Sequence, residues 1–210
     1  LNQKEIGIRY AAKIDKQYEE LNLIISHIGG GVSVTAHRQG RMVDSNDIVN
    51  GDGPMAPTRS GSIPATALIK MCYSGKYTEK EMYEKITKNG GLVDHLGISD
   101  VREILVRIKN GDSYARLVYD AMGYQIAKNI GAYATVLCGK VDAIILTGGI
   151  AHDEYLVNQI TRMVSYIAPV KIMPGEFEME ALASGALRVL TNQEIPKNYS
   201  GKPVWNGFKD

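Results

Sequence analysis

Apolar residues recur at helical spacing at the start of the chain, and short β-branched runs follow them. Ile6, Tyr10 and Ile14 stand among Lys and Glu residues, which predicts an amphipathic helix. Three runs with the alternation typical of strands come next, and the second and third are separated by a "QGR" turn. The predicted strands cover residues 21–28, 32–39 and 42–47. We therefore expect a helix followed by a three-strand hairpin arrangement.

A segment dense in Gly, Pro, Ser and Asp, "NGDGPMAPTRSGSIP" at 50–64, predicts a long loop, and long ordered loops are usually functional. Helical patterns follow the loop. They cover 65–73, 78–88, 99–109 and 113–137. Thr78 and Ser99 are expected to cap two of these helices, and "NGG" and "NG" after them are helix-stop signals.

Two strand-to-helix units close the pattern. An apolar strand over 141–146 leads through Gly148 and Gly149 into a helix from about Asp153. A second strand over 170–173 leads into a helix over 180–191, and an irregular tail begins at Pro196. The order of elements predicts an α/β fold with a mixed sheet, a hairpin start and helices packed on it.

Composition narrows the class of protein. The 210 residues carry a net charge of +1, with 22% charged and 44% hydrophobic residues, which is typical of a globular chain and argues against a dedicated nucleic-acid binder. No apolar run approaches the roughly 20 residues that cross a bilayer, so no membrane association is expected. Scattered histidines and two distant cysteines predict no zinc site and a cytoplasmic location. The chain starts at Leu1 inside a helical pattern, so we expect that it was cut from a longer protein, by domain dissection or proteolysis.

The stretch "HIGGGVS" supports two interpretations. Three glycines, Gly29, Gly30 and Gly31, can simply form a tight hairpin turn, because glycine tolerates positive φ. Alternatively, their backbone amides can form a phosphate nest, with His27 and Ser33 at its sides. Neither the P-loop nor the dinucleotide-binding pattern is present, so such a phosphate would sit on a hairpin tip.

Three further segments have both structural and functional interpretations. Arg59 in "PTRSG" is either a surface arginine or a bidentate phosphate or carboxylate ligand in a rigid loop. "ILTGGIAHD" is either an ordinary turn or a ligand-binding strand end. In "EMEALASGA", Glu178 and Glu180 either favour the helix dipole or serve a ligand, and the small residues after them allow close packing.

These four motifs, in this order, resemble the acetate and butyrate kinase family of the actin-like ATPase superfamily. The glycine motif "HIGGGVSVTAH" is similar to the butyrate kinase branch, as are "GPMAPTRSG", "GGLVDHLG" and the closing "YSGKPVWNGF". The resemblance spans nearly the whole chain. It implies a ribonuclease H-like, actin-like ATPase lobe.

The resemblance implies a reaction, butanoate + ATP to butanoyl phosphate + ADP, by in-line transfer to the carboxylate. It assigns catalysis to Arg59 and His27, and the carboxylate substrate to Arg59 beside an acyl pocket. The implied nucleotide-binding residues are Gly29, Gly30, Gly31, Ser33, Gly148, Gly149 and Ile150; the acyl-pocket residues are Pro54 and Met55; and the Mg²⁺ residues are Glu178 and Glu180. Either glutamate fits the family pattern, with Glu178 slightly favoured.

The family also has an N-terminal lobe that this chain lacks. We therefore expect residues 1–210 to form a C-terminal nucleotide-binding lobe with a helical insertion at about 65–137, inactive alone and assembling as a homodimer or higher oligomer. Two alternatives remain open: an acetate or branched-chain fatty acid kinase, and a non-catalytic actin-like nucleotide-binding protein.

Overall fold

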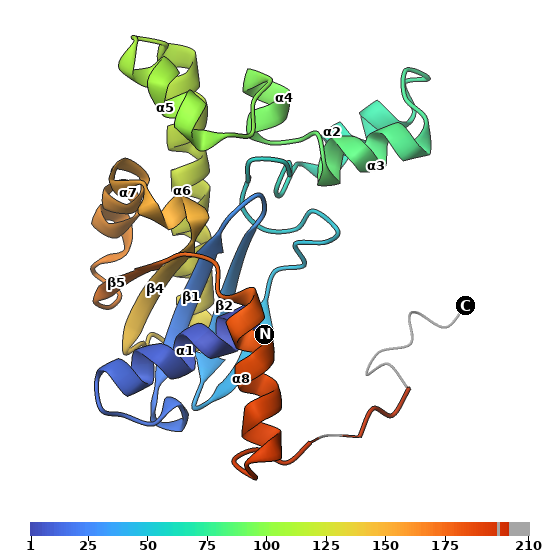
Figure 1. Cartoon of the computed structure of the whole chain (residues 1–210). Helices are drawn as coiled ribbons and strands as arrows, with labels where there is room; N and C mark the ends of the chain where they lie inside the picture. The colour runs from blue at the N-terminus through green and yellow to red at the C-terminus, as the bar shows by residue number, and fades with distance from the viewer. Residues whose placement is uncertain (197, 202–210) are drawn as a thin grey trace.

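A five-stranded mixed sheet forms the centre of the computed structural model, which describes residues 1–196 and 198–201 (Figure 1). The strand order is β3-β2-β1-β4-β5. The strands are β1 (Asn22–Ile28), β2 (Val32–Arg38), β3 (Arg41–Ser45), β4 (Ala143–Gly148) and β5 (Val170–Pro174). The first three are antiparallel neighbours, whereas β4 pairs parallel with both β1 and β5. The predicted mixed α/β fold is confirmed. Most of the closing motif at 199–208 lies outside the described residues.

Alternating side chains of the central strands pack on opposite faces of the sheet. Leu23 and Ile25 of β1 face α1 (Asn2–Lys13), with α8 (Glu178–Leu190) beside that helix. Ile24 points to the other face, which is covered by α6 (Ser113–Val136) and α7 (Glu154–Val164). Both faces of β1 are therefore covered by helices, which is why the strand reads as a nearly continuous apolar run.

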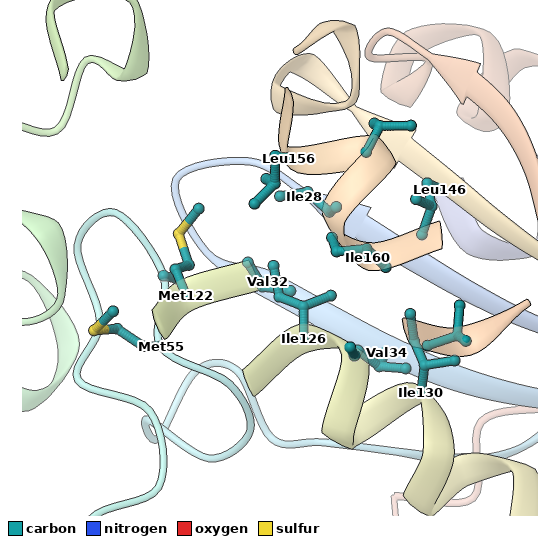
Figure 2. Packing of buried hydrophobic residues seen from close by; sticks show 14 of the residues in the cluster. Ile28, Val32, Val34, Met55, Met122, Ile126, Ile130, Leu146, Leu156 and Ile160 are labelled. Atoms are coloured by element: carbon teal, nitrogen blue, oxygen red, sulfur yellow. The ribbon is translucent and has the colours of Figure 1, made fainter. Parts of the chain in front are cut away.

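The larger core lies between the sheet and the two helices α6 and α7. Figure 2 shows side chains of the hairpin meeting those of α6 and α7, among them Val34 beside Ile130. Met55 reaches the edge of the same cluster from the long loop, where Met122 of α6 also lies. The hairpin and the long loop are thus anchored on one common core.

Four helices connect the long loop to α6, and they extend away from the sheet (Figure 1). They are α2 (Ala65–Cys72), α3 (Glu79–Thr87), α4 (Leu92–Leu96) and α5 (Val101–Lys109). Thr78 caps α3 as predicted, in a reciprocal capping box with Glu81. Two sequence expectations were wrong here: α4 was not predicted, and Asp100 rather than Ser99 caps α5. Five residues are too few to show a helical period, and Asp and Ser are equally good caps.

The observed bounds of several other elements differ by a few residues from the predicted ones. β4 starts and ends two residues later than predicted and includes Gly148, and a 3₁₀ turn, η2 (Gly149–His152), follows it. α8 begins at Glu178 rather than at residue 180. A second 3₁₀ turn, η1 (Tyr18–Glu20), joins α1 to β1.

Candidate functional site

The glycine turn lies between β1 and β2, as predicted, and the amide of Gly29 donates to the carbonyl of Gly31 at 3.0 Å. None of its three glycines adopts a left-handed φ, so the positive φ that one of the two interpretations invoked is not required here. Space is the reason instead. A Cβ on Gly31 would lie 2.6 Å from Nη1 of Arg59, whereas a Cβ on Gly30 would meet nothing within 4 Å. Gly30 thus leaves an open position at the hairpin tip.

The backbone amides of Gly30 and Gly31 donate no hydrogen bond to any other described residue. Gly30 is exposed and Gly31 half-buried. Two adjacent unpaired N–H groups without neighbouring side chains are the elements of an anion nest. The phosphate interpretation of the turn therefore has the donors that it requires.

The long loop is fastened directly onto this turn. Thr58 donates from its backbone amide (3.2 Å) and from its hydroxyl (2.9 Å) to the carbonyl of Gly30. The next residue, Arg59, is half-buried, and its Nε donates to the carbonyl of Ile48 at 3.0 Å. Nη1 lies 3.3 Å from the hydroxyl of Thr58. The guanidinium is therefore held across Gly31, and its other N–H groups bond to no described residue.

His27 and Ser33 stand on opposite strands beside the turn, where they form a pair in the β1–β2 register. The first turn of α1 contacts both: Asn2 Nδ2 lies 3.1 Å from His27 Nδ1, and Gln3 Nε2 donates to Ser33 Oγ at 2.9 Å. Burial lowers the pKa of His27, and the charges of Glu178 and Glu176 oppose that shift. Sequence reasoning missed Asn2 and Gln3, because they read as the solvent-facing start of a helix.

Gly148 ends β4 and Gly149 begins η2, and the two glycines have different local environments. Gly148 has φ of +92°, and a Cβ there would overlap the carbonyl oxygen of Ile28 on β1, so only glycine fits. That is a packing reason, different from the expected approach to a ligand. Gly149 is exposed and Ile150 half-buried, and both belong to η2. These two, and not Gly148, line the cleft described next.

A cleft of about 760 Å³ joins the two glycine elements. Gly29 and Gly30 of the hairpin form one side, and Gly149 and Ile150 form another. The remaining walls come from Pro57 and Thr58, from the α5 start (Ser99, Asp100, Val101, Arg102, Leu105), and from His152, Asp153, Glu154 and Glu176. The structure thus brings together two motifs that lie about 120 residues apart in the sequence. The α5 start was not expected in the site.

Asp153 lines the cleft and also stabilises the surrounding helices through its carboxylate. Its carboxylate accepts from the amides of Tyr155 and Leu156 at the start of α7 and from the hydroxyl of Tyr119 at 2.7 Å. Burial and the bond to Asp153 raise the pKa of Tyr119 well above its usual range. The edge of the cleft is therefore fixed to α6 and α7.

Three glutamates lie just before α8 and in its first turn. Glu178 accepts from Asn2 Nδ2 at 2.9 Å, and Glu176 lines the cleft with Oε1 3.5 Å from a Cβ placed on Gly149. Glu180 is exposed and makes no hydrogen bond or ion pair with a described residue. Glu176 was missed because it precedes the helix and carries no periodic signal. Of the two glutamates expected at a metal, Glu178 is the one beside His27.

Pro54 and Met55 are buried rather than exposed to the cleft. The Met55 amide donates to Gln125 Oε1 at 2.8 Å, and its side chain packs in the main core (Figure 2). Their expected place in an acyl pocket remains a prediction.

No helix among residues 1–196 and 198–201 combines the length and apolarity needed to cross a membrane.

The five-stranded mixed sheet and the helices that cover it form the actin-like fold that is found in acetate kinases. The crystal structure of Porphyromonas gingivalis acetate kinase matches with a TM-score of 0.81 at 24% identity, covering 90% of this chain and 54% of that one. That likeness shows the fold.

Residues 4–174 match the Acetokinase family, and the chain belongs to that family. It is 50% identical over 199 residues to "Butyrate kinase 2" of Clostridium acetobutylicum, covering 95% of this chain and 56% of that protein. It is also 48% identical to "Probable butyrate kinase" of Bacteroides thetaiotaomicron, covering 93% and 55%. The chain therefore spans about half the length of these curated relatives.

Proposed function

We propose that this chain is the nucleotide-binding half of a butyrate kinase, which transfers the γ-phosphoryl group of ATP to the carboxylate of butanoate. The observation that carries the proposal is the identity of about 50% to butyrate kinases over 95% of the chain. The geometry supports it independently, because the tip of the glycine turn and the strand end at Gly149 line one cleft, and Arg59 is held across Gly31 of the same turn.

In the proposed reaction a butanoate oxygen attacks the γ-phosphorus in line, and the bond to the ADP oxygen breaks. A carboxylate is already an adequate nucleophile, so the protein has to align the groups and stabilise the charge on the transferring phosphoryl oxygens. The free amides of Gly30 and Gly31 would hold phosphate oxygens. Arg59 would bridge the carboxylate and the transferring group with its unpaired N–H groups, and His27 would donate a further hydrogen bond.

The nucleoside would occupy the cleft beside Gly149 and Ile150, where the absence of a side chain on Gly149 permits close approach. Asp100 and Arg102 at the α5 start offer polar groups on the opposite wall. This placement would put the nucleoside and the phosphates on one line between η2 and the hairpin tip.

The carboxylates of Glu176 and Glu178 fit a Mg²⁺ ion, because this metal is usually bound through one or two carboxylates plus phosphate oxygens and water. Bound Mg²⁺ supplies neutralisation of phosphate charge. No group of three potential ligand side chains occurs among the described residues, and such a group is not required for this kind of site. Glu180 is the less suitable candidate, since it lies away from these contacts.

The cleft in this superfamily lies between two lobes, and the curated relatives are almost twice as long as this chain. We therefore expect residues 1–210 alone to bind nucleotide weakly and to give no turnover. The catalytic test belongs in a protein that supplies both halves. An acetate or branched-chain acid as the preferred substrate is the nearest alternative, and a series of short acids decides it.

The proposal is tested in two steps. Calorimetry with MgADP on this chain measures nucleotide binding. Phosphoryl transfer is then measured in the longer protein with ATP, Mg²⁺ and acetate, propanoate, butanoate or isobutanoate, by trapping the acyl phosphate with hydroxylamine. Butanoate is expected to give the highest kcat/KM. No acyl phosphate from any acid would refute the proposal.

Arg59→Ala separates a kinase from a non-catalytic nucleotide-binding protein. Removing this charge is expected to lower kcat by a factor of about 10³ while the nucleotide Kd changes little. Arg162→Ala is the matched control, because Arg162 is an exposed arginine on α7 that does not line the cleft. Unchanged turnover in Arg59→Ala would remove the role given to this arginine.

A further inference from the structure

The first turn of α1 reaches into the candidate site through one side chain. The amide nitrogen of Asn2 lies 3.1 Å from Nδ1 of His27 and 2.9 Å from Oε1 of Glu178. The three residues belong to α1, β1 and α8, and 25 and 176 positions of sequence separate Asn2 from its two partners. One amide therefore joins three elements beside the glycine turn.

The chemistry of these partners fixes the orientation of the Asn2 amide. An NH₂ group has two hydrogens to donate and no lone pair for accepting, so it suits one carboxylate oxygen and one unprotonated ring nitrogen at once. The flipped amide would place its oxygen against the Glu178 carboxylate, and two acceptors would then repel each other. The side-chain oxygen of Asn2 is buried without a hydrogen-bond partner in the described chain. This orientation of the amide therefore leaves one acceptor unsatisfied, which costs free energy.

This orientation determines where the imidazole carries its proton. Because Nδ1 of His27 accepts from Asn2, the neutral ring has its hydrogen on Nε2. Nε2 points towards the glycine turn, where it would lie 3.2 Å from a Cβ on Gly29. The absence of a side chain on Gly29 lets the ring edge approach the turn.

We propose that Asn2 is a positioning residue that holds His27 as the Nε2–H tautomer and so directs a neutral N–H donor at the anion held by the glycine turn. The identity of that anion as a nucleotide phosphate rests on the proposed function, whereas the tautomer does not. Burial favours the neutral imidazole, since it lowers the pKa of His27 against the opposing charges of Glu178 and Glu176. Without Asn2, the Glu178 carboxylate would be free to attract a proton to Nδ1.

The tautomer can be read directly from the ¹⁵N resonances of the histidine rings in this chain, at a pH where the imidazoles are neutral. His27→Gln assigns the His27 signals. Wild-type His27 is expected to show an unprotonated Nδ1 and a protonated Nε2. Asn2→Asp replaces the donor by an acceptor of the same shape, so it is expected to reverse the pattern, and Asn2→Ala should give a mixture.

Two controls separate this effect from a general loosening of α1. Gln3→Ala removes a neighbouring contact to Ser33 and should leave the His27 pattern unchanged. The buried His37, held by Tyr18 and Thr35, should keep its own pattern in the Asn2 variants. A wild-type His27 protonated on Nδ1, or an Asn2→Asp protein that keeps the wild-type pattern, would overturn the inference.

A binding measurement tests the anion half. Because only part of the Asn2→Ala population keeps the Nε2–H donor, this variant should bind ATP about 2-fold more weakly and keep a nearly unchanged ADP affinity, since the donor faces the terminal phosphate. Equal ATP affinities in the two proteins would refute that half. If the longer protein forms no acyl phosphate from any acid, the proposed function fails and the anion half fails with it, while the ring resonances still decide the tautomer.

Discussion

His37 is a fully buried histidine that should make the protein sensitive to acid. It lies on β2, with the Tyr18 hydroxyl at Nδ1 and the Thr35 hydroxyl 2.8 Å from Nε2. The Thr35 hydroxyl donates in turn to Gln3 Oε1 at 2.7 Å. Thr35 therefore accepts from Nε2–H, and Nδ1 accepts from Tyr18, so the neutral ring satisfies the network. A second proton has no acceptor prepared for it.

Burial lowers the pKa of His37 from 6.5 to about 4. The neutral form is favoured in the folded state, so the stabilisation is complete above pH 6.5 and is lost as the pH falls towards 4. Between these values the unfolded chain binds more protons than the folded one, and stability rises with pH. Evaluated at pH 5, the linkage relation gives a loss of about 2 kcal/mol from this one group, relative to pH 8.

Urea unfolding at pH 8 and pH 5 measures the effect, followed by circular dichroism and by tyrosine fluorescence. With a slope of roughly 2 kcal/mol/M, the His37 contribution corresponds to a midpoint difference of about 1 M. His37→Gln has no titrating ring, so its difference between the two pH values is expected to be smaller than that of the wild type by about this amount. Its stability at pH 8 also falls, because the buried contacts change.

Carboxylates titrate in the same pH range, and the comparison between variants removes their contribution. His95→Gln is the matched control, since His95 is exposed and its loss should preserve the wild-type difference. Identical pH dependence in the wild type and in His37→Gln would show that the buried imidazole is not the acid-sensitive group.

Three further substitutions test local conclusions. Gly148→Ala should lower the free energy of unfolding by about 3 kcal/mol or more, because the new Cβ would overlap the Ile28 carbonyl at a positive φ; a midpoint within error of the wild type would contradict this. Gly30→Ala should leave stability within about 0.5 kcal/mol and weaken MgADP binding, measured by urea titration and calorimetry, since only a ligand would meet its methyl group. Asp153→Ala should cost about 2–4 kcal/mol in urea unfolding by removing the α7 cap and the partner of the buried Tyr119 hydroxyl, and a loss below 1 kcal/mol would count against the network.

The sequence was sufficient to predict the hairpin, the long loop and the two strand-to-helix units, because these depend on local periodicity and on glycine and proline. Of the residues it singled out, Gly29, Gly30 and Gly149 line one cleft, and their roles there stay predictions. The contacts of Asn2 were not predictable, since its partners lie 25 and 176 positions away. A helix-start asparagine looks the same whether it faces solvent or a histidine.

The structural reasons for two glycines also differ from those that the sequence suggested. One of the two interpretations of the glycine turn required positive φ angles, whereas at Gly31 a Cβ would instead meet the side chains of Arg59 and Ile48. Gly148 was assigned to a ligand because strand ends often bind one, yet a neighbouring strand explains it fully. In both cases the deciding atom belongs to a segment that only the tertiary structure brings near.

The pairing of β1 with β4 has a consequence for how the chain folds. Roughly 115 residues separate the two strands in the sequence, yet they are direct neighbours at the centre of the sheet. Roughly 100 residues lie between the end of β3 and the start of β4, so at a synthesis rate of about 5–20 residues per second the β1–β3 meander would wait on the order of 5–20 s for its partner. During that interval one edge of β1, rich in Ile and Leu, is open to pairing with other chains. Nascent-chain aggregation during expression should therefore depend on how quickly β4 is delivered, and slower translation across residues 65–142 should increase it.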